Sequence, residues 1–205
     1  MDLIQSFRYT ESWEDPGESG IIVSDPTLAD PSARSRLGIN SAAHPEAIVD
    51  GFYDMDRAAA ITWAEDCFKY KYFSQLFGYM IRDQKIGNKL VDLSFNEGVA
   101  GHKSEAVRIA QRAVNTMAST PLVVDGTIGP KTLDAINLAE PVQLLVAIKA
   151  KATDFYVGLV AQHPSMQKYL NGWLARVNDQ YAAYTHAQAI LAHTGGRMRG
   201  LYGLR

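Results

Sequence analysis

The stretch Ser104–Met117, which reads SEAVRIAQRAVNTM, carries the clearest secondary-structure signal in the chain. Its apolar side chains recur at intervals of three and four residues, at Ala106, Ile109, Ala110, Ala113 and Met117. Because an α-helix has about 3.6 residues per turn, this spacing gathers them on one face. The stretch therefore predicts an amphipathic helix that packs against other helices.

Helical patterns continue on both sides of this stretch. We expect further helices over 2–12, 56–68 and 89–96 before it, and from Pro130, Pro141 and Ser165 after it. Proline suits the first position of a helix, where no backbone N–H is needed. The helices from Ser104, Pro141 and Ser165 each carry an apolar stripe, and three such stripes predict a shared core.

The segment 13–45 is different, because it is rich in Pro, Gly, Ser and Asp and has no helical stripe. Within it, 20–24 (GIIVS) and 36–40 (RLGIN) predict two short strands. We therefore expect a mainly α fold, with a small β-element near residues 20–40 and a helical bundle lobe.

Composition narrows the classes of function. The 205 residues have a formal net charge of −2, which gives no case for nucleic acid or an anionic membrane surface. The single cysteine cannot form an internal disulfide, and the five scattered histidines lack metal-site spacing. We expect no metal, no cofactor, no stable membrane association and a monomer. The first residues lack the pattern of a secretory signal peptide, so we expect synthesis in the cytoplasm.

Glu11 and the run DPSARSRLGIN, residues 30–40, resemble the signature of the glycoside hydrolase family 108 muramidases. In that family a glutamate on a helix precedes an Asp-Pro-Gly-Gly-x-Thr-x-x-Gly-Ile-Thr run. Asp30-Pro31 and Gly38-Ile39 match, while Ser35 stands in place of the threonine. Residues 32–33, Ser-Ala, replace the two glycines, and the gap after Glu11 is longer than the family pattern.

A second region resembles the predicted peptidoglycan-binding domain that follows in this family. The resemblance rests on the runs at 92–98, 110–115, 124–136 and 171–176, of which VDGTIGPKTLDAI at 124–136 is the most specific. The two resemblances together imply a lysozyme-like fold. They divide the chain into a catalytic region, 1–85, a helical peptidoglycan-binding region packed on it, 86–186, and a tail, 187–205.

The resemblance implies a peptidoglycan hydrolase that cleaves the β-1,4 bond between N-acetylmuramic acid and N-acetylglucosamine. Such a reaction needs a protonated carboxylic acid for the leaving oxygen and a second carboxylate for the sugar cation or the attacking water. Glu11 is the candidate acid and Asp30 the second carboxylate, with Ser35 holding the water. Asp25, also followed by proline, is the alternative to Asp30.

Tyr70, Tyr72, Phe73 and Asn96 are the candidate contacts to the glycan strand, because flat rings pack on the apolar faces of sugars. Core packing of the rings and a structural hydrogen bond from Asn96 are the alternatives. A lytic transglycosylase, or a wall-binding protein without activity, is the alternative function. For a chain without a signal peptide, we expect a phage-type endolysin that reaches the periplasmic cell wall after release through a holin.

Overall fold

The computed structural model describes residues 1–15, 20–24, 34–97 and 104–181. In this part of the chain the helices are α1 (Leu3–Glu14), α2 (Glu46–Val49), α3 (Arg57–Phe68), α4 (Gln84–Glu97), α5 (Glu105–Asn115), α6 (Pro130–Leu138), α7 (Pro141–Gln162) and α8 (Gln167–Val177). A π-helical segment, Lys69–Phe73, extends α3. The strands are β1 (Val23–Ser24), β2 (Arg34–Arg36) and β3 (Ile39–Asn40). The predicted mainly α fold with a small β-element, as in lysozyme-like proteins, is confirmed.

Several helix starts follow the local sequence signals. The side chains of Asp2 and Asp56 accept hydrogen bonds from the backbone N–H groups of Gln5 and Ala59, which caps α1 and α3. Pro130 and Pro141 occupy the first positions of α6 and α7, as predicted. The helix predicted over 89–96 begins earlier, at Gln84.

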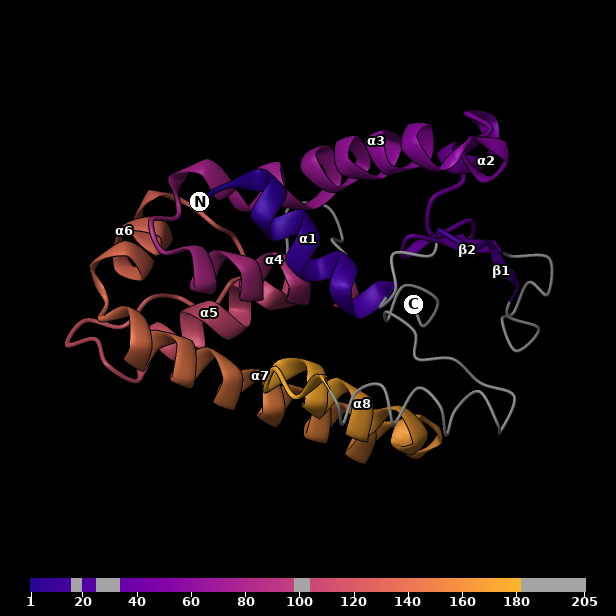
Figure 1. The fold of residues 1–205 in the computed structure, drawn as a ribbon. Helices are drawn as coiled ribbons and strands as arrows, with labels where there is room; N and C mark the ends of the chain where they lie inside the picture. Colours follow the sequence, from indigo (N-terminus) through magenta and orange to yellow (C-terminus); the bar gives the residue numbers. More distant parts are fainter. Residues whose placement is uncertain (16–19, 25–33, 98–103, 182–205) are drawn as a thin grey trace.

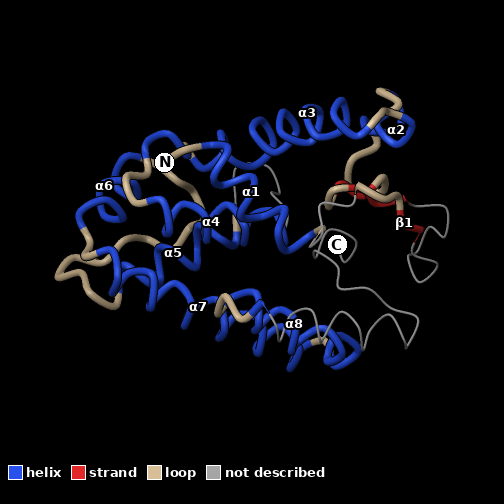
Figure 2. Tube along the Cα trace, viewed as in Figure 1, coloured by secondary structure: helices blue, strands red, loops and turns tan. Residues whose placement is uncertain are grey.

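The β-element is an antiparallel sheet at one end of the molecule (Figure 2). Ser35 in β2 pairs with Val23 on one side and with Asn40 on the other. The prediction of one strand over 36–40 was wrong: Leu37 and Gly38 both have positive φ, 49° and 75°, and form a tight turn between β2 and β3. Two positive φ values in sequence are typical of the turn that joins twisted hairpin strands.

Helix α4 lies at the centre of the fold and packs against both α1 and α5 (Figure 1). Helix α5 in turn packs on α7, and α7 lies beside α8. Four residues of the predicted stripe on α5, Ala106, Ile109, Ala110 and Ala113, are buried. The fifth, Met117, is 40% exposed because α5 ends at Asn115. None of the described helices combines the length and apolar character needed to cross a bilayer.

A buried ionic network joins α1, α4 and α8. The guanidinium of Arg176 donates to both carboxylate oxygens of Asp92, at 2.7–3.2 Å, and to Glu14 Oε1 at 2.6 Å. Lys89, 1% exposed, donates to the backbone oxygen of Arg176 and to Asp179 Oδ1, both at 2.8 Å. Charges this deeply buried need partners. The network therefore fixes the end of α1 against α4 and α8, which lie far from it in the sequence.

Candidate functional site

Glu11 lies near the carboxyl end of α1 and is 4% exposed. Two aromatic side chains of the same helix, Phe7 and Trp13, are buried as well. Phe7, one turn earlier, meets the ring of Phe68 edge-on with centroids 5.5 Å apart. Trp13, 3% exposed, packs with Ala175 of α8 and the ring of Tyr9. Glu11 is therefore a carboxyl group held in the interior by the packing of α1.

The guanidinium of Arg8 connects Glu11 to a second carboxylate. Its Nη1 lies 2.7 Å from Glu11 Oε2, and its Nη2 lies 3.7 Å from Glu65 Oε1 on α3. A nearby cation favours the ionised form of a carboxyl group, whereas burial favours the protonated form. Neither Arg8 nor Glu65 was predicted from the sequence as a partner of Glu11. The spacing of Arg8 and Glu11, three apart on a helix, was a usable signal, whereas only folding brings Glu65 here.

The turn of the β-element sits directly on the end of α1. A Cβ atom on Gly38 would lie 2.8 Å from Glu14 Cγ and 3.1 Å from the ring of Phe95. A side chain does not fit there, and the φ of +75° also favours glycine. Gly38, one of the matching positions in the sequence resemblance, thus allows the hairpin to lie against Glu14, one helical turn after Glu11.

The other predicted catalytic residues are placed only in part. Ser35 is half-buried in the middle of β2, the strand that leads into this turn. Asp30, the predicted second carboxylate, and Asp25, its alternative, both lie outside the described residues. Their roles, and that of Ser35, stay predictions.

The predicted glycan contacts divide into exposed and buried groups. Tyr70 is 60% exposed, whereas Tyr72 and Phe73 are 3% and 0% exposed. Tyr72 packs on Phe95 with ring centroids 4.8 Å apart, so burial favours the core alternative for Tyr72 and Phe73. Asn96 is also buried, and its Nδ2 donates to the hydroxyl of Tyr156 at 2.5 Å. Of these four candidates, Tyr70 is the one whose ring is open to solvent.

Folding also brings together three potential metal ligands that show no metal-site spacing in the sequence. His44, Glu46 and Cys67 bring one potential ligand atom each to within 4.8 Å of one another. Burial lowers the pKa of His44 below its ordinary value, although Glu46 opposes this shift. Burial raises the pKa of the Cys67 thiol to about 12. The thiol is thus protonated near neutral pH and is no nucleophile in this state.

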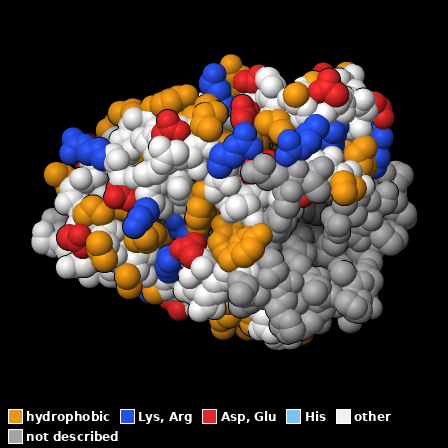
Figure 3. Space-filling model, in the orientation of Figure 1, with side chains coloured by type: hydrophobic (Ala, Val, Ile, Leu, Met, Phe, Trp, Pro, Cys, Tyr) orange, Lys and Arg blue, Asp and Glu red, His pale blue; other side chains and the backbone are white. Residues whose placement is uncertain are grey.

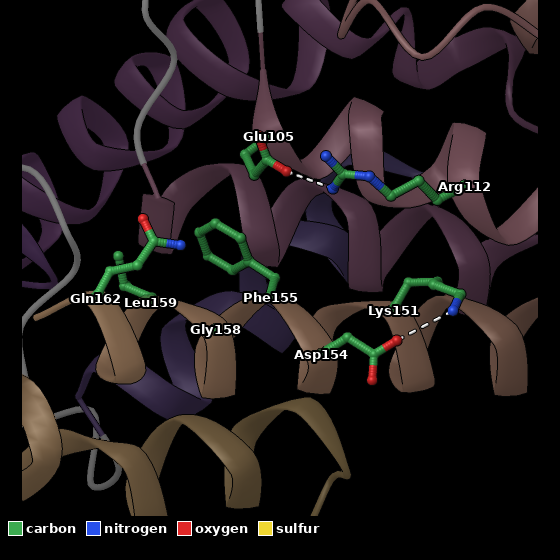
Figure 4. A pocket seen from close by; sticks show the side chains of 8 residues that line it. All are labelled: Glu105, Arg112, Lys151, Asp154, Phe155, Gly158, Leu159 and Gln162. Atoms are coloured by element: carbon green, nitrogen blue, oxygen red, sulfur yellow. Dashed lines mark hydrogen bonds and ion pairs between the residues drawn. The ribbon is translucent and has the colours of Figure 1, made fainter.

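A shallow groove of about 470 Å³ runs between α5 and α7 (Figure 4). The ring of Phe155 projects from α7 towards α5, beside Leu159 and Gln162. The same groove is lined by the ion pairs Glu105–Arg112 and Lys151–Asp154, whose N···O distances are 2.6 and 3.0 Å. Charges of both signs are likewise interspersed on the described part of the face in Figure 3. The groove thus combines an apolar floor with charged, hydrogen-bonding walls.

Comparison with known proteins relates the C-terminal half to the bacterial cell wall. Residues 105–178 match the family model described as a predicted peptidoglycan domain. This segment contains the whole of α5, α6, α7 and α8, and every residue that lines the groove. The match supports the expectation that peptidoglycan is the binding partner.

The whole chain has a structural relative. The structure of SagA from Brucella abortus superimposes with a TM-score of 0.61 and 20% sequence identity, covering 91% of this chain and 94% of that chain. No match was found among the curated proteins. At this identity the likeness concerns the fold. The chain therefore shares its whole-length fold with SagA, and its segment 105–178 is similar to a peptidoglycan domain.

Proposed function

We propose that this protein cleaves the glycan strands of peptidoglycan between N-acetylmuramic acid and N-acetylglucosamine, with Glu11 as the general acid. The observation that carries the proposal is the burial of the Glu11 carboxyl group at 4% exposure, one turn from the hairpin. An acid for a glycosidic oxygen must retain its proton near neutral pH, and burial of the carboxyl group favours this. The family match at 105–178 supplies the substrate class.

Arg8 has a role in the proposed mechanism because it lies against the Glu11 carboxyl group. Its ion pair with Glu11 favours the carboxylate, which is the form that acts as a base in a later step. The Arg8 side chain is 42% exposed, so its guanidinium can turn towards solvent when a glycan strand covers the site. Exclusion of water by the sugar then favours the protonated acid.

The groove between α5 and α7 is the proposed contact for the strand beyond the cleaved bond. Its apolar ring, Phe155, suits the apolar face of a sugar. Its paired charges suit the amide and carboxylate groups of a peptide stem. This placement lets the matched segment contribute to substrate binding while it also packs on the rest of the fold.

Mass spectrometry of the fragments released from purified sacculi tests the proposal. We expect fragments that end in reducing N-acetylmuramic acid. Replacing Glu11 with glutamine keeps the shape and removes the acid, so the rate should fall by about 10² to 10⁴-fold. The matched control is Glu65→Gln, which removes a carboxylate from the same arginine and should change the rate by less than about tenfold.

The other outcomes separate the alternatives. Anhydro-muramic ends would identify a lytic transglycosylase. Binding of sacculi without released fragments would identify a wall-binding protein. A folded Glu11→Gln variant with normal rate would remove Glu11 from the mechanism, and a larger loss in Glu65→Gln would transfer the role to Glu65.

A further inference from the structure

We propose that His44, Glu46 and Cys67 form a binding site for a single zinc-like divalent ion. Among the described residues, these side chains meet between the end of the β-element, the short helix α2 and helix α3. His44 and Cys67 are 4% and 8% exposed, while the Glu46 side chain is 35% exposed. The site is therefore closed on two sides and open to water on the third.

The distances between the ligand atoms fit a tetrahedral ion. Around tetrahedral zinc, a sulfur at about 2.3 Å and a nitrogen at about 2.1 Å lie about 3.6 Å apart, and a nitrogen and an oxygen lie about 3.3 Å apart. In the structure Cys67 Sγ lies 3.6 Å from His44 Nδ1. His44 Nδ1 lies 3.1 Å from Glu46 Oε1. Two edges of the ligand triangle thus already have the length that an ion at its centre requires.

The second ring nitrogen of His44 has the partner that a metal-bound histidine needs. Its Nε2 lies 2.9 Å from the hydroxyl of Tyr72. With the ion on Nδ1, the ring carries its hydrogen on Nε2 and donates it to the Tyr72 oxygen, which fixes the orientation of the ring. The Cys67 thiol releases its proton to solvent, and the ionised Glu46 supplies the third ligand. A water molecule on the open side completes the tetrahedron.

One cation already lies at this opening. Lys71 Nζ lies 3.2 Å from Glu46 Oε1, and the Lys71 side chain is 55% exposed. The ammonium and the metal ion compete for the same carboxylate oxygen, so the lysine must turn into solvent when the ion binds. The bound ion would fasten the segment after β3 to α3. This site is independent of the glycan-cleaving site proposed above.

Cobalt titration of the purified protein, treated first with a chelator, tests the site. Cys67 is the chain's only cysteine, so a near-ultraviolet thiolate-to-cobalt charge-transfer band reports this residue alone. We expect the band to saturate at one equivalent and to disappear when zinc displaces the cobalt. Cys67→Ser should abolish the band, and Glu46→Gln should weaken affinity on the order of tenfold or more.

Two further variants keep the test decisive. Lys71→Gln removes the competing cation and should strengthen cobalt binding several-fold, whereas loss of an unrelated surface lysine would not. His163→Gln, at the exposed end of α7, is the matched histidine control and should bind normally. If Cys67→Ser fails to fold, Glu46→Gln and Lys71→Gln still give opposite shifts. Absence of the band at saturating cobalt, or equal affinity in all variants, would overturn the proposal.

Discussion

The buried arginine of α8 offers the sharpest test of how the fold is held together. Arg176 is 5% exposed and binds Asp92 through three hydrogen bonds and Glu14 through one. Arg176→Met keeps most of the side-chain volume and removes the charge. We expect a marked loss of stability, because the Asp92 carboxylate, 1% exposed, would stay buried without the Arg176 guanidinium that balances its charge.

The structure sets the expected magnitude. Removing one partner of a buried ion pair costs about 3–5 kcal/mol, because the other charge stays desolvated. Glu14 is 16% exposed and can recover water, so its share is small and the lower half of the range applies. For a chain of this size, about 3–4 kcal/mol corresponds to a decrease in Tm of roughly 10 °C.

Denaturant unfolding at neutral pH measures the effect. Arg112→Met is the control, because Arg112 is 42% exposed in its pair with Glu105 and should cost less than about 1 kcal/mol. The double variant Asp92→Leu/Arg176→Met should recover much of the loss, since an apolar pair replaces both charges. If Arg176→Met costs no more than Arg112→Met, the network does not hold α1, α4 and α8 together.

Three further predictions concern the charge of Asp179, the independence of the N-terminal region and the ion pair of Arg8 with Glu11. Burial raises the pKa of Asp179, but nearby cations, led by Lys89, outweigh this and hold the pKa below its ordinary 3.8. The ionised carboxylate therefore stabilises the fold fully above pH 3.8, and this stabilisation is lost as the pH falls through the folded-state pKa. Asp179→Asn, which suits the φ of 58°, should make the acid-induced loss of stability in denaturant melts shallower, and an unchanged slope would contradict this. A fragment of residues 1–86 lacks most of α4 and all of α8, so its circular dichroism should show no cooperative melt; a cooperative, active fragment would establish a separate catalytic domain. Arg8→Gln removes the guanidinium that lies 2.7 Å from the Glu11 carboxyl group, so the sacculus-cleavage rate at fixed pH should fall, and an unchanged rate would separate this contact from the reaction.

Much of the architecture was accessible from the chain alone, because its signals are local. The stripe on α5, the caps at Asp2 and Asp56, and the prolines that begin α6 and α7 each depend on residues a few positions apart. The same holds for Gly126, which follows Asp125 in a tight turn and has a φ of +81°, a value that suits glycine. Trp173 lies at helical spacing with Leu170 and Val177, and it is 2% exposed and stacks on Tyr156 in the core.

Single residues within a local pattern were less predictable. In 36–40 the pattern favoured one strand, but the turn at Leu37 and Gly38 divides it, since the hairpin must fold back onto the end of α1. The aromatic run at 70–73 shows the same limit. Two rings have opposite environments there, Tyr70 exposed and Tyr72 buried, because residues two apart on a helical segment point to opposite sides, and hydrophobicity alone does not say which side faces the core.

By itself the sequence determined the helical class, the small β-element near residues 20–40, and Glu11 as the candidate acid on the first helix. Tertiary structure alone decided which distant charges meet. Glu65 joins Glu11 across Arg8, Arg176 joins Asp92 and Glu14, and His44 and Glu46 come to Cys67. Contacts within a helix depend on fixed spacing of about 3.6 residues per turn, so they are visible in the chain. Contacts between helices depend on how whole apolar faces pack, and no spacing along the chain records them.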